Sequence, residues 1–440
     1  MTKTNRRWTF MVYMAGDNGK VFEQLKGGKT LMTPMEEQGW KDIQEMEAVG
    51  SRAEVAVVVQ FDTLSDRENT YRIHIPSKGE KREIQNIPEQ NTGNPDSLRD
   101  FIIWGTENYP AENYAVILWN HGTGWKEDDI YAFARNRGVE IQASQDEVRS
   151  LTRNNRRLSH AFFLSSITEV LQLEDEDSRA IAFDDSSLDF LDNAKLQQAF
   201  REAEEKTGKK VSLIGMDACL MSMVEVAYQL RSNADYMVAS QEVEPLSGYP
   251  YTAILENLTA NAEMTPDALA KLIVREYGRY YGGESRGSTS QVTQSATNLM
   301  VVEKLAETLG KLADVLRRSL SEEDIYTENA LFHAQRKAVR FEDKDFVDLY
   351  DFLRLLRDKY AGDRDEFIQV IDGVIDLMVM EIEPQLILAN VGLGLRFERV
   401  KGLSIYSPVR GYSQYYEKSD FASCGWGKFL QLLNDVNNFR

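Results

Sequence analysis

Short apolar runs alternate with segments of helical periodicity over the first 250 residues of the chain. The run 54–59 is β-branched and almost uninterrupted, which is typical of a strand that is covered on both faces. Five such runs predict strands, at residues 8–14, 54–61, 114–119, 211–216 and 236–240. Helical patterns lie between them, at 35–49, from Pro95 onward and at 188–206. Because strands separated by helices form parallel sheets, we expect an α/β fold around a mostly parallel, doubly wound sheet.

The second part of the chain has a different pattern and is mostly helical after about residue 260. Amphipathic helices are predicted at 302–320, 345–360 and 365–380, and another begins near Pro266. Strand character returns at 393–398 and 402–406. We therefore expect an α/β domain at 1–258 and a mainly helical C-terminal region at 259–440 that returns strands to the sheet. Residues 126–187 are mostly polar and predict a long, partly irregular insertion in the first domain.

The charge of the chain narrows the choice of partners. The 440 residues carry a net charge of −19. Such a surface repels phosphate groups, so we expect neither a nucleic-acid nor a membrane partner. No stretch of about 18 uncharged apolar residues is present that could span a membrane. The apolar run at 8–14 is too short for a secretory signal, so we expect a cytoplasmic protein, or a secreted one if a presequence precedes these residues.

Two of the predicted strands end in motifs with reactive side chains. An Asn-His-Gly motif follows the first at 120–122, and an Asp-Ala-Cys motif follows the second at 217–219. Active sites of parallel α/β sheets lie beyond the carboxyl ends of the strands, so His121 and Cys219 are placed where a base and a nucleophile can meet. The backbone N–H groups of Gly122 and Cys219 could form an oxyanion hole. A helix predicted at 222–230 would place its N-terminus beside the sulfur, which favours the thiolate.

Each of these residues also has a purely structural interpretation. A cysteine after an apolar strand is more often a small core residue, and a histidine at a strand end is usually a hydrogen-bonded structural group. The only other cysteine, Cys424, follows no predicted parallel strand, and we interpret it as non-catalytic. Two cysteines form no disulfide framework, although a single bridge is compatible with the sequence. The pattern alone leaves both interpretations of His121 and Cys219 open.

The motifs resemble those of the caspase-like cysteine peptidases, and on closer reading those of the clostripain family. The resemblance is carried by Asn-His-Gly-Thr-Gly-Trp at 120–125, Met-Asp-Ala-Cys-Leu-Met at 216–221, and segments at 8–18, 238–242 and 402–406. These segments are spread over most of the chain, and the two central motifs are specific in combination. The resemblance implies a caspase-like three-layer α/β sandwich with the mainly helical C-terminal region packed on it.

The resemblance also implies a catalytic dyad and a substrate preference. It implies that Cys219 is the nucleophile, that His121 is the general acid and base, and that an acyl-enzyme forms. Members of the family cleave proteins or peptides after arginine or lysine, and the aspartate two residues before the nucleophile, here Asp217, lines the pocket for that side chain. A carboxylate there would form a charge-assisted hydrogen bond to a guanidinium group. The structural interpretation of Asp217 is a helix-capping or turn residue.

Several alternatives accompany this hypothesis. The same dyad could perform peptide ligation or transamidation, or the chain could be an inactive regulatory or interaction protein with a caspase-like fold. Some members of the group mature by self-cleavage between the two motifs, and the basic cluster at 153–157 is either such a site or a solvated patch. Glu242, Glu244 and the loop 245–251 follow a predicted strand and either shape the substrate cleft or form a structural turn.

The expected chemistry requires no cofactor. Clostripain-like enzymes are associated with calcium, and acidic groups at 127–129, 174–177 and 184–185 are candidate oxygen ligands. None of these groups has the spacing of an EF-hand, so we assign no metal site. Zinc is not expected because no Cys/His cluster has suitable spacing. The sequence identifies no regulatory partner.

Overall fold

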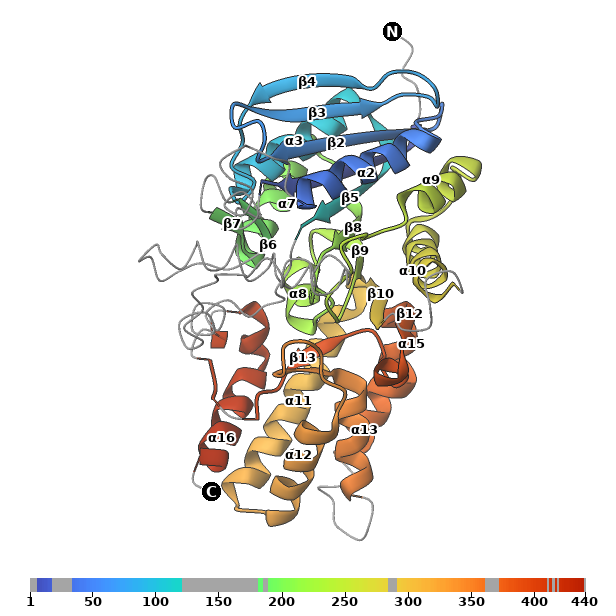
Figure 1. Cartoon of the computed structure of the whole chain (residues 1–440). Coiled ribbons are helices and arrows are strands. Elements are labelled where there is room, and N and C mark those ends of the chain that lie inside the picture. The colour runs from blue at the N-terminus through green and yellow to red at the C-terminus, as the bar shows by residue number, and fades with distance from the viewer. Residues whose placement is uncertain are drawn as a thin grey trace, which may run out of the picture.

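A nine-stranded sheet runs through the part of the chain that the structure describes. The structure, a computed structural model, describes residues 6–17, 34–120, 181–184, 189–283, 291–360, 372–409, 411–413, 416–417 and 419–438. The strand order is β12-β10-β9-β8-β5-β1-β2-β3-β4 (Figure 1). Its five central strands are parallel, namely β9 (Ala234–Ala239), β8 (Val211–Asp217), β5 (Ala111–Trp119), β1 (Arg6–Gly16) and β2 (Val55–Thr63). All five strands predicted for the first 250 residues are confirmed.

Antiparallel strands extend the sheet on both sides. On one side lie β3 (Asn69–Ile75) and β4 (Glu83–Pro88), and on the other β10 (Val292–Asn298) and β12 (Ile387–Leu393). Since β10 and β12 come from beyond residue 259, the C-terminal region does return strands to the main sheet. The boundary predicted at residue 258 stays a prediction.

Two of the predicted C-terminal strands need correction. The strand expected at 393–398 was wrong, because β12 ends at Leu393 and a 3-10 helix, η4 (Leu395–Phe397), follows. Gly394 between them has a φ of +90°, a conformation that turns the chain out of the strand. The strand expected at 402–406 exists as β13 (Ser404–Tyr406), but it pairs with β11 (Phe346–Asp348) in a separate two-stranded sheet.

Helices cover both faces of the sheet and complete a three-layer sandwich. Side chains alternate along β1, so that Met11 and Tyr13 pack into one hydrophobic cluster while Phe10 and Val12 pack into the other. The cluster around Phe10 is covered by α2 (Pro34–Val49), α9 (Tyr251–Ala260) and α10 (Pro266–Gly282). The cluster around Met11 is covered by α3 (Pro95–Asn108), α7 (Asn193–Thr207), α8 (Val224–Leu230), α11 (Val302–Ser321), α12 (Ile325–Lys337), α13 (Leu349–Tyr360) and α16 (Trp426–Asn438).

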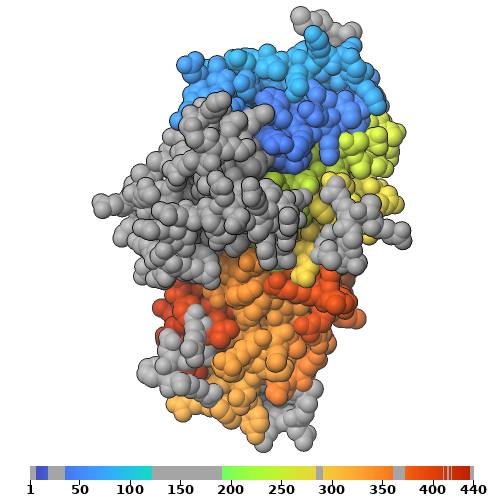
Figure 2. Space-filling model, in the orientation of Figure 1, coloured from blue at the N-terminus to red at the C-terminus, as the bar shows by residue number. Residues whose placement is uncertain are grey.

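The C-terminal helices lie at the opposite end of the molecule from the β3–β4 pair. Figure 1 shows α11, α12, α13 and α16 grouped together, and in Figure 2 they form the orange and red end while the N-terminal strands form the blue end. A short hairpin, β6 (Ile181–Asp184) with β7 (Asp189–Leu191), precedes α7. Among the described residues, no helix is both long enough and apolar enough to cross a membrane.

The C-terminal segment is joined to α8 by a buried glutamate. One carboxylate oxygen of Glu225, Oε1, accepts hydrogen bonds from the N–H of Tyr406 at 3.0 Å and from the hydroxyl of Tyr416 at 2.8 Å. The other oxygen has no hydrogen-bond donor among the described residues. Burial raises the pKa of Glu225 to about 7, although these hydrogen bonds oppose the shift.

We expect the stability of the protein to reflect this carboxyl group. Between its ordinary pKa and 7, the folded state binds more protons than the unfolded state, so the free energy of unfolding falls as the pH rises through that window. Glu225→Gln removes the titration and keeps an oxygen acceptor. Relative to this variant, the free energy of unfolding of the wild type should fall by on the order of 3 kcal/mol between pH 4.5 and pH 8, as measured by urea unfolding. Glu307→Gln, on the exposed face of α11, is the control and should follow the wild type; parallel curves for all three proteins would contradict the assignment.

Candidate active site

The carboxyl ends of β5 and β8 bring the two sequence motifs to the same edge of the sheet. Trp119 of β5 is paired in register with Asp217 of β8. The next residue, Asn120, donates its backbone N–H to the main-chain oxygen of Asp217 at 3.3 Å and its side-chain amide to Ala15 at 2.9 Å. His121 and Gly122 lie outside the described residues, so the dyad and the oxyanion hole stay predictions.

Cys219 lies in the turn that follows β8 and is buried, with 5% of its surface exposed. Its Sγ accepts a hydrogen bond from the backbone N–H of Glu244 at 3.3 Å. A donor directed at sulfur stabilises the thiolate more than the thiol, because the anion is the better acceptor. The turn thus holds the sulfur beside a group that favours its reactive form.

The backbone after the cysteine is in an unusual conformation. Leu220 has a φ of +63°, in the left-handed region that costs a non-glycine residue roughly 1–2 kcal/mol. Backbone conformations of this kind cluster at functional sites. The helix α8 begins only at Val224, so Cys219 lies outside its first turn. The helix thus begins two residues later than predicted, and an effect of its N-terminus on the sulfur stays a prediction.

Asp217 is buried at the end of β8 and is held by the loop after β9. Its Oδ2 accepts hydrogen bonds from the backbone N–H of Tyr249 at 3.1 Å and from the hydroxyl of Tyr251 at 2.8 Å. Burial raises the pKa of Asp217, and these hydrogen bonds oppose the shift. The sequence predicted the position of this carboxylate, but its donors come from a loop about thirty residues downstream that had two interpretations.

Cys219, Asp217 and Glu244 line one narrow pocket with an accessible volume of about 30 Å³. Trp119, Pro245 and Leu246 supply apolar walls. Of the two glutamates that the sequence singled out, Glu244 faces this pocket. The carboxylate of Glu242 instead lies 3.8 Å from Nη1 of Arg396 and does not line the pocket. The pocket thus combines carboxyl groups with apolar walls beside the cysteine sulfur.

A further carboxyl group, Asp42 on α2, lies behind the pocket and was not predicted. It accepts hydrogen bonds from Nε1 of Trp119 at 2.8 Å and from Nε2 of Gln38 at 2.7 Å. Burial raises the pKa of Asp42 well above its ordinary value, and the charge of Asp217 adds to the shift. The only sequence signal was its location on a helix face that also carries the buried Ile43 and Met46. The described Lys and Arg side chains form no ion pair with Asp42, Asp217 or Glu244.

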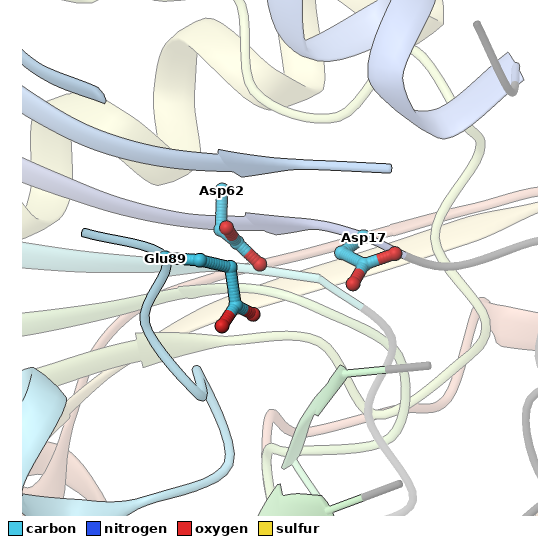
Figure 3. A group of neighbouring side chains, drawn as sticks. All are labelled: Asp17, Asp62 and Glu89. Carbon is cyan, nitrogen blue, oxygen red and sulfur yellow. The ribbon is translucent and has the colours of Figure 1, made fainter. Parts of the chain in front are cut away.

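A second group of carboxylates lies along the same edge of the sheet. Asp17 after β1, Asp62 in β2 and Glu89 after β4 offer oxygen atoms within 4.8 Å of one another (Figure 3). One oxygen of Asp62 accepts a hydrogen bond from Thr70 at 2.8 Å. Carboxylate oxygens are the ligands that Ca²⁺ and Mg²⁺ prefer, so these residues could hold such an ion. The candidate ligands at 127–129 and 174–177 lie outside the described residues, and calcium binding stays a prediction.

Gly248 provides a stability test of the contact between the loop and Asp217. Its φ is +52°, and a Cβ atom there would lie 2.6 and 2.7 Å from the two carboxylate oxygens of Asp217. Gly248→Ala should therefore destabilise the protein by the left-handed penalty and by about 1–3 kcal/mol more for overpacking, as measured by chemical unfolding.

Gly208 is the matched control. It has a φ of +66° and no atom within 4 Å of a Cβ atom built there. Gly208→Ala should show the left-handed penalty of roughly 1–2 kcal/mol alone. If the two variants lost the same free energy of unfolding, this would contradict the close approach of residue 248 to Asp217.

Known proteins share both the sequence features and the architecture. The sequence model of the clostripain family matches residues 33–153 and 169–426. Clostripain of Hathewaya histolytica is 29% identical over 276 residues, which are 58% of this chain and 43% of that protein. The chain thus spans less than half the length of this curated relative.

Two solved structures cover almost the whole chain. An inactive zymogen C11 protease from Parabacteroides distasonis is similar over 96% of this chain and 99% of its own, with a TM-score of 0.59 and 18% identity. A secreted C11 cysteine protease from Bacteroides thetaiotaomicron, in complex with an irreversible peptide inhibitor, has the same coverage and TM-score at 17% identity. These similarities establish the fold, and the family match extends over most of the sequence. The chain belongs to the clostripain family of cysteine peptidases.

Proposed function

We propose that the protein is a cysteine endopeptidase that cleaves after arginine or lysine. The observation that carries the proposal is one pocket that contains both the Cys219 sulfur and the buried Asp217 carboxylate. A substrate side chain that reached Asp217 would place its own peptide bond near the sulfur. Family membership supports the reaction class, and the charge of the pocket supports the choice of a basic side chain.

In this mechanism the thiolate of Cys219 attacks the substrate carbonyl, and the resulting acyl-enzyme is hydrolysed by water. His121 accepts the thiol proton and later donates it to the leaving amine. The backbone N–H groups of Gly122 and Cys219 stabilise the oxyanion. The N–H of Glu244, at 3.3 Å from the sulfur, adds a fixed donor for the thiolate. When the sulfur bonds to the substrate carbon and loses its negative charge, this N–H becomes available to the tetrahedral intermediate or to solvent.

The pocket favours a basic side chain for an electrostatic reason. Tyr249 and Tyr251 hold the Asp217 carboxylate at a depth that bulk water hardly reaches, since the residue is 5% exposed. A charge-assisted hydrogen bond to a guanidinium or ammonium group there contributes about 1.5–3 kcal/mol. A neutral side chain would leave the carboxylate desolvated and without a cation.

Two variants test this assignment directly. Cys219→Ala should abolish cleavage of Arg and Lys peptides, because no other group supplies the nucleophile. Asp217→Asn should lower kcat/KM for Arg peptides by about ten- to hundred-fold, with little change for peptides that have a neutral residue before the cut bond. Steady-state kinetics on matched Arg, Lys and norleucine peptides provides the measurement.

Cys424→Ala is the control for the nucleophile. Burial raises the pKa of the Cys424 thiol to about 11, so it stays protonated, and its loss should leave cleavage intact. Unchanged discrimination between Arg and norleucine in Asp217→Asn would refute the pocket assignment. Ligated products in the presence of an amine nucleophile would identify a transamidase. A wild type that no arginine-directed thiol probe labels would identify an inactive protein.

We also propose self-cleavage at the basic cluster 153–157, which lies outside the described residues. The specificity for Arg and Lys proposed above would recognise this cluster. Intact-mass analysis of the wild type should show two fragments whose masses define a cut in the cluster, whereas Cys219→Ala should stay full length. A single full-length species for active wild type would remove the idea.

A further inference from the structure

Glu244 makes two contacts in the pocket, one through its backbone and one through its side chain. The backbone N–H donates to Sγ of Cys219. The side chain is buried, with 4% of the residue exposed, and its Oε1 accepts a hydrogen bond from Nε2 of Gln294 on β10 at 2.9 Å. Its carboxyl group lies in the same pocket as that of Asp217, and each affects the ionisation of the other. Two neighbouring carboxyl groups without a cation do not both ionise readily, so one of them tends to keep its proton.

The surroundings indicate which group carries it. Asp217 accepts hydrogen bonds from Tyr249 and Tyr251, and both of them stabilise its charged form. Glu244 has only the Gln294 amide as a donor among the described residues, and its Oε2 has none. Burial raises the pKa of Glu244 well above its ordinary value, and the charge of Asp217 adds to the shift. These contacts favour the charge on Asp217 and the proton on Glu244.

In the described part of the chain, no cation forms an ion pair with Glu244. The described titratable groups that act on it are Asp217 on β8, Tyr249 in the loop before α9 and Tyr277 on α10. Asp42 on α2 and Tyr251 at the start of α9 act on Asp217. Cys219 contacts its backbone. None of the described Lys or Arg side chains forms an ion pair with Glu244 or Asp217. A cation that arrives in the pocket therefore meets a pair that can give up a proton in exchange.

We propose that Glu244 is a second specificity residue of the pocket, and that a substrate guanidinium or ammonium group replaces the proton shared by Glu244 and Asp217. This inference rests on the proposed cleavage after Arg or Lys. In this exchange the O–H bond of Glu244 breaks and the proton leaves to solvent. The substrate cation then lies between two carboxylates, so one positive charge replaces another. A guanidinium group can donate to both at once, because its five N–H groups diverge in one plane.

The exchange makes cation binding depend on pH with a defined sign. Because one proton leaves when the cation binds, the Ki of a guanidinium ligand should fall with rising pH by up to about tenfold per pH unit while Glu244 is protonated. Agmatine is a suitable probe, since it has a guanidinium group and no carbonyl for Cys219 to attack. Its competitive inhibition of wild-type cleavage is measured from pH 5 to pH 9, together with KM and kcat for an Arg peptide.

Glu244→Gln is the test variant, because glutamine keeps the size and an oxygen acceptor for Gln294 but cannot supply the proton. Its agmatine Ki should lose the pH dependence, and at pH 8 its Ki and KM should be higher than those of the wild type by about tenfold, with a smaller change in kcat. Glu242→Gln is the matched control: that side chain is also buried, two residues away, but it faces Arg396. The control should keep the wild-type profile.

The outcomes separate the two proposals. A wild type that cleaves no Arg or Lys peptide overturns the proposed function. An active wild type whose Asp217→Asn variant loses Arg preference, but whose Glu244→Gln variant keeps the wild-type Ki, KM and pH profile, overturns this inference alone. A pH dependence that persists in Glu244→Gln also overturns it, because another group then supplies the proton. If Glu244→Gln is inactive, agmatine binding by calorimetry in two buffers still counts the protons released.

Discussion

A carboxylate that is buried beside a cysteine sulfur has to be stabilised by the protein, since water is excluded, and the rest of this site follows from that requirement. Asp217 obtains its donors from the loop after β9, through the N–H of Tyr249 and the hydroxyl of Tyr251. The same loop directs the N–H of Glu244 at the Cys219 sulfur. One loop therefore orients the group that would select the substrate and the group that would attack it. An unpaired carboxylate in this position would cost several kcal/mol.

The site also depends on parts of the chain far from the two central strands. Gln294 of β10 contacts Glu244, and the hydroxyl of Tyr281 on α10 donates to the main-chain oxygen of Gly248 at 2.8 Å. On the far side of the cysteine turn, Glu225 fixes α8 to Tyr406 and Tyr416. The residues that line the pocket all precede residue 258, and contacts from β10 and α10 beyond it support them.

Hydrophobic patterning predicted the parallel centre of the sheet because β1, β2, β5, β8 and β9 bury apolar side chains on both faces. It missed β10 because three consecutive buried side chains of this strand, Thr293, Gln294 and Ser295, are polar and form hydrogen bonds, of which that of Gln294 reaches Glu244. It missed β4 because that strand is an exposed edge with no apolar face. The strand-end rule predicted Asp217 and Cys219, but the proximity of Glu244 to both depends on the path of a loop, which periodicity does not encode.

The left-handed conformation of the residue after the cysteine affects how the sulfur of Cys219 is held. The left-handed backbone of Leu220 destabilises the fold by roughly 1–2 kcal/mol. The burial of its side chain stabilises the fold by about 1.5–3 kcal/mol. Local preference and tertiary packing thus oppose each other at one residue, with a narrow margin in favour of packing. The turn therefore keeps its conformation only while the side chain of Leu220 stays packed against its neighbours. Any loosening of that neighbourhood would let the segment relax and carry the sulfur away from its partner N–H.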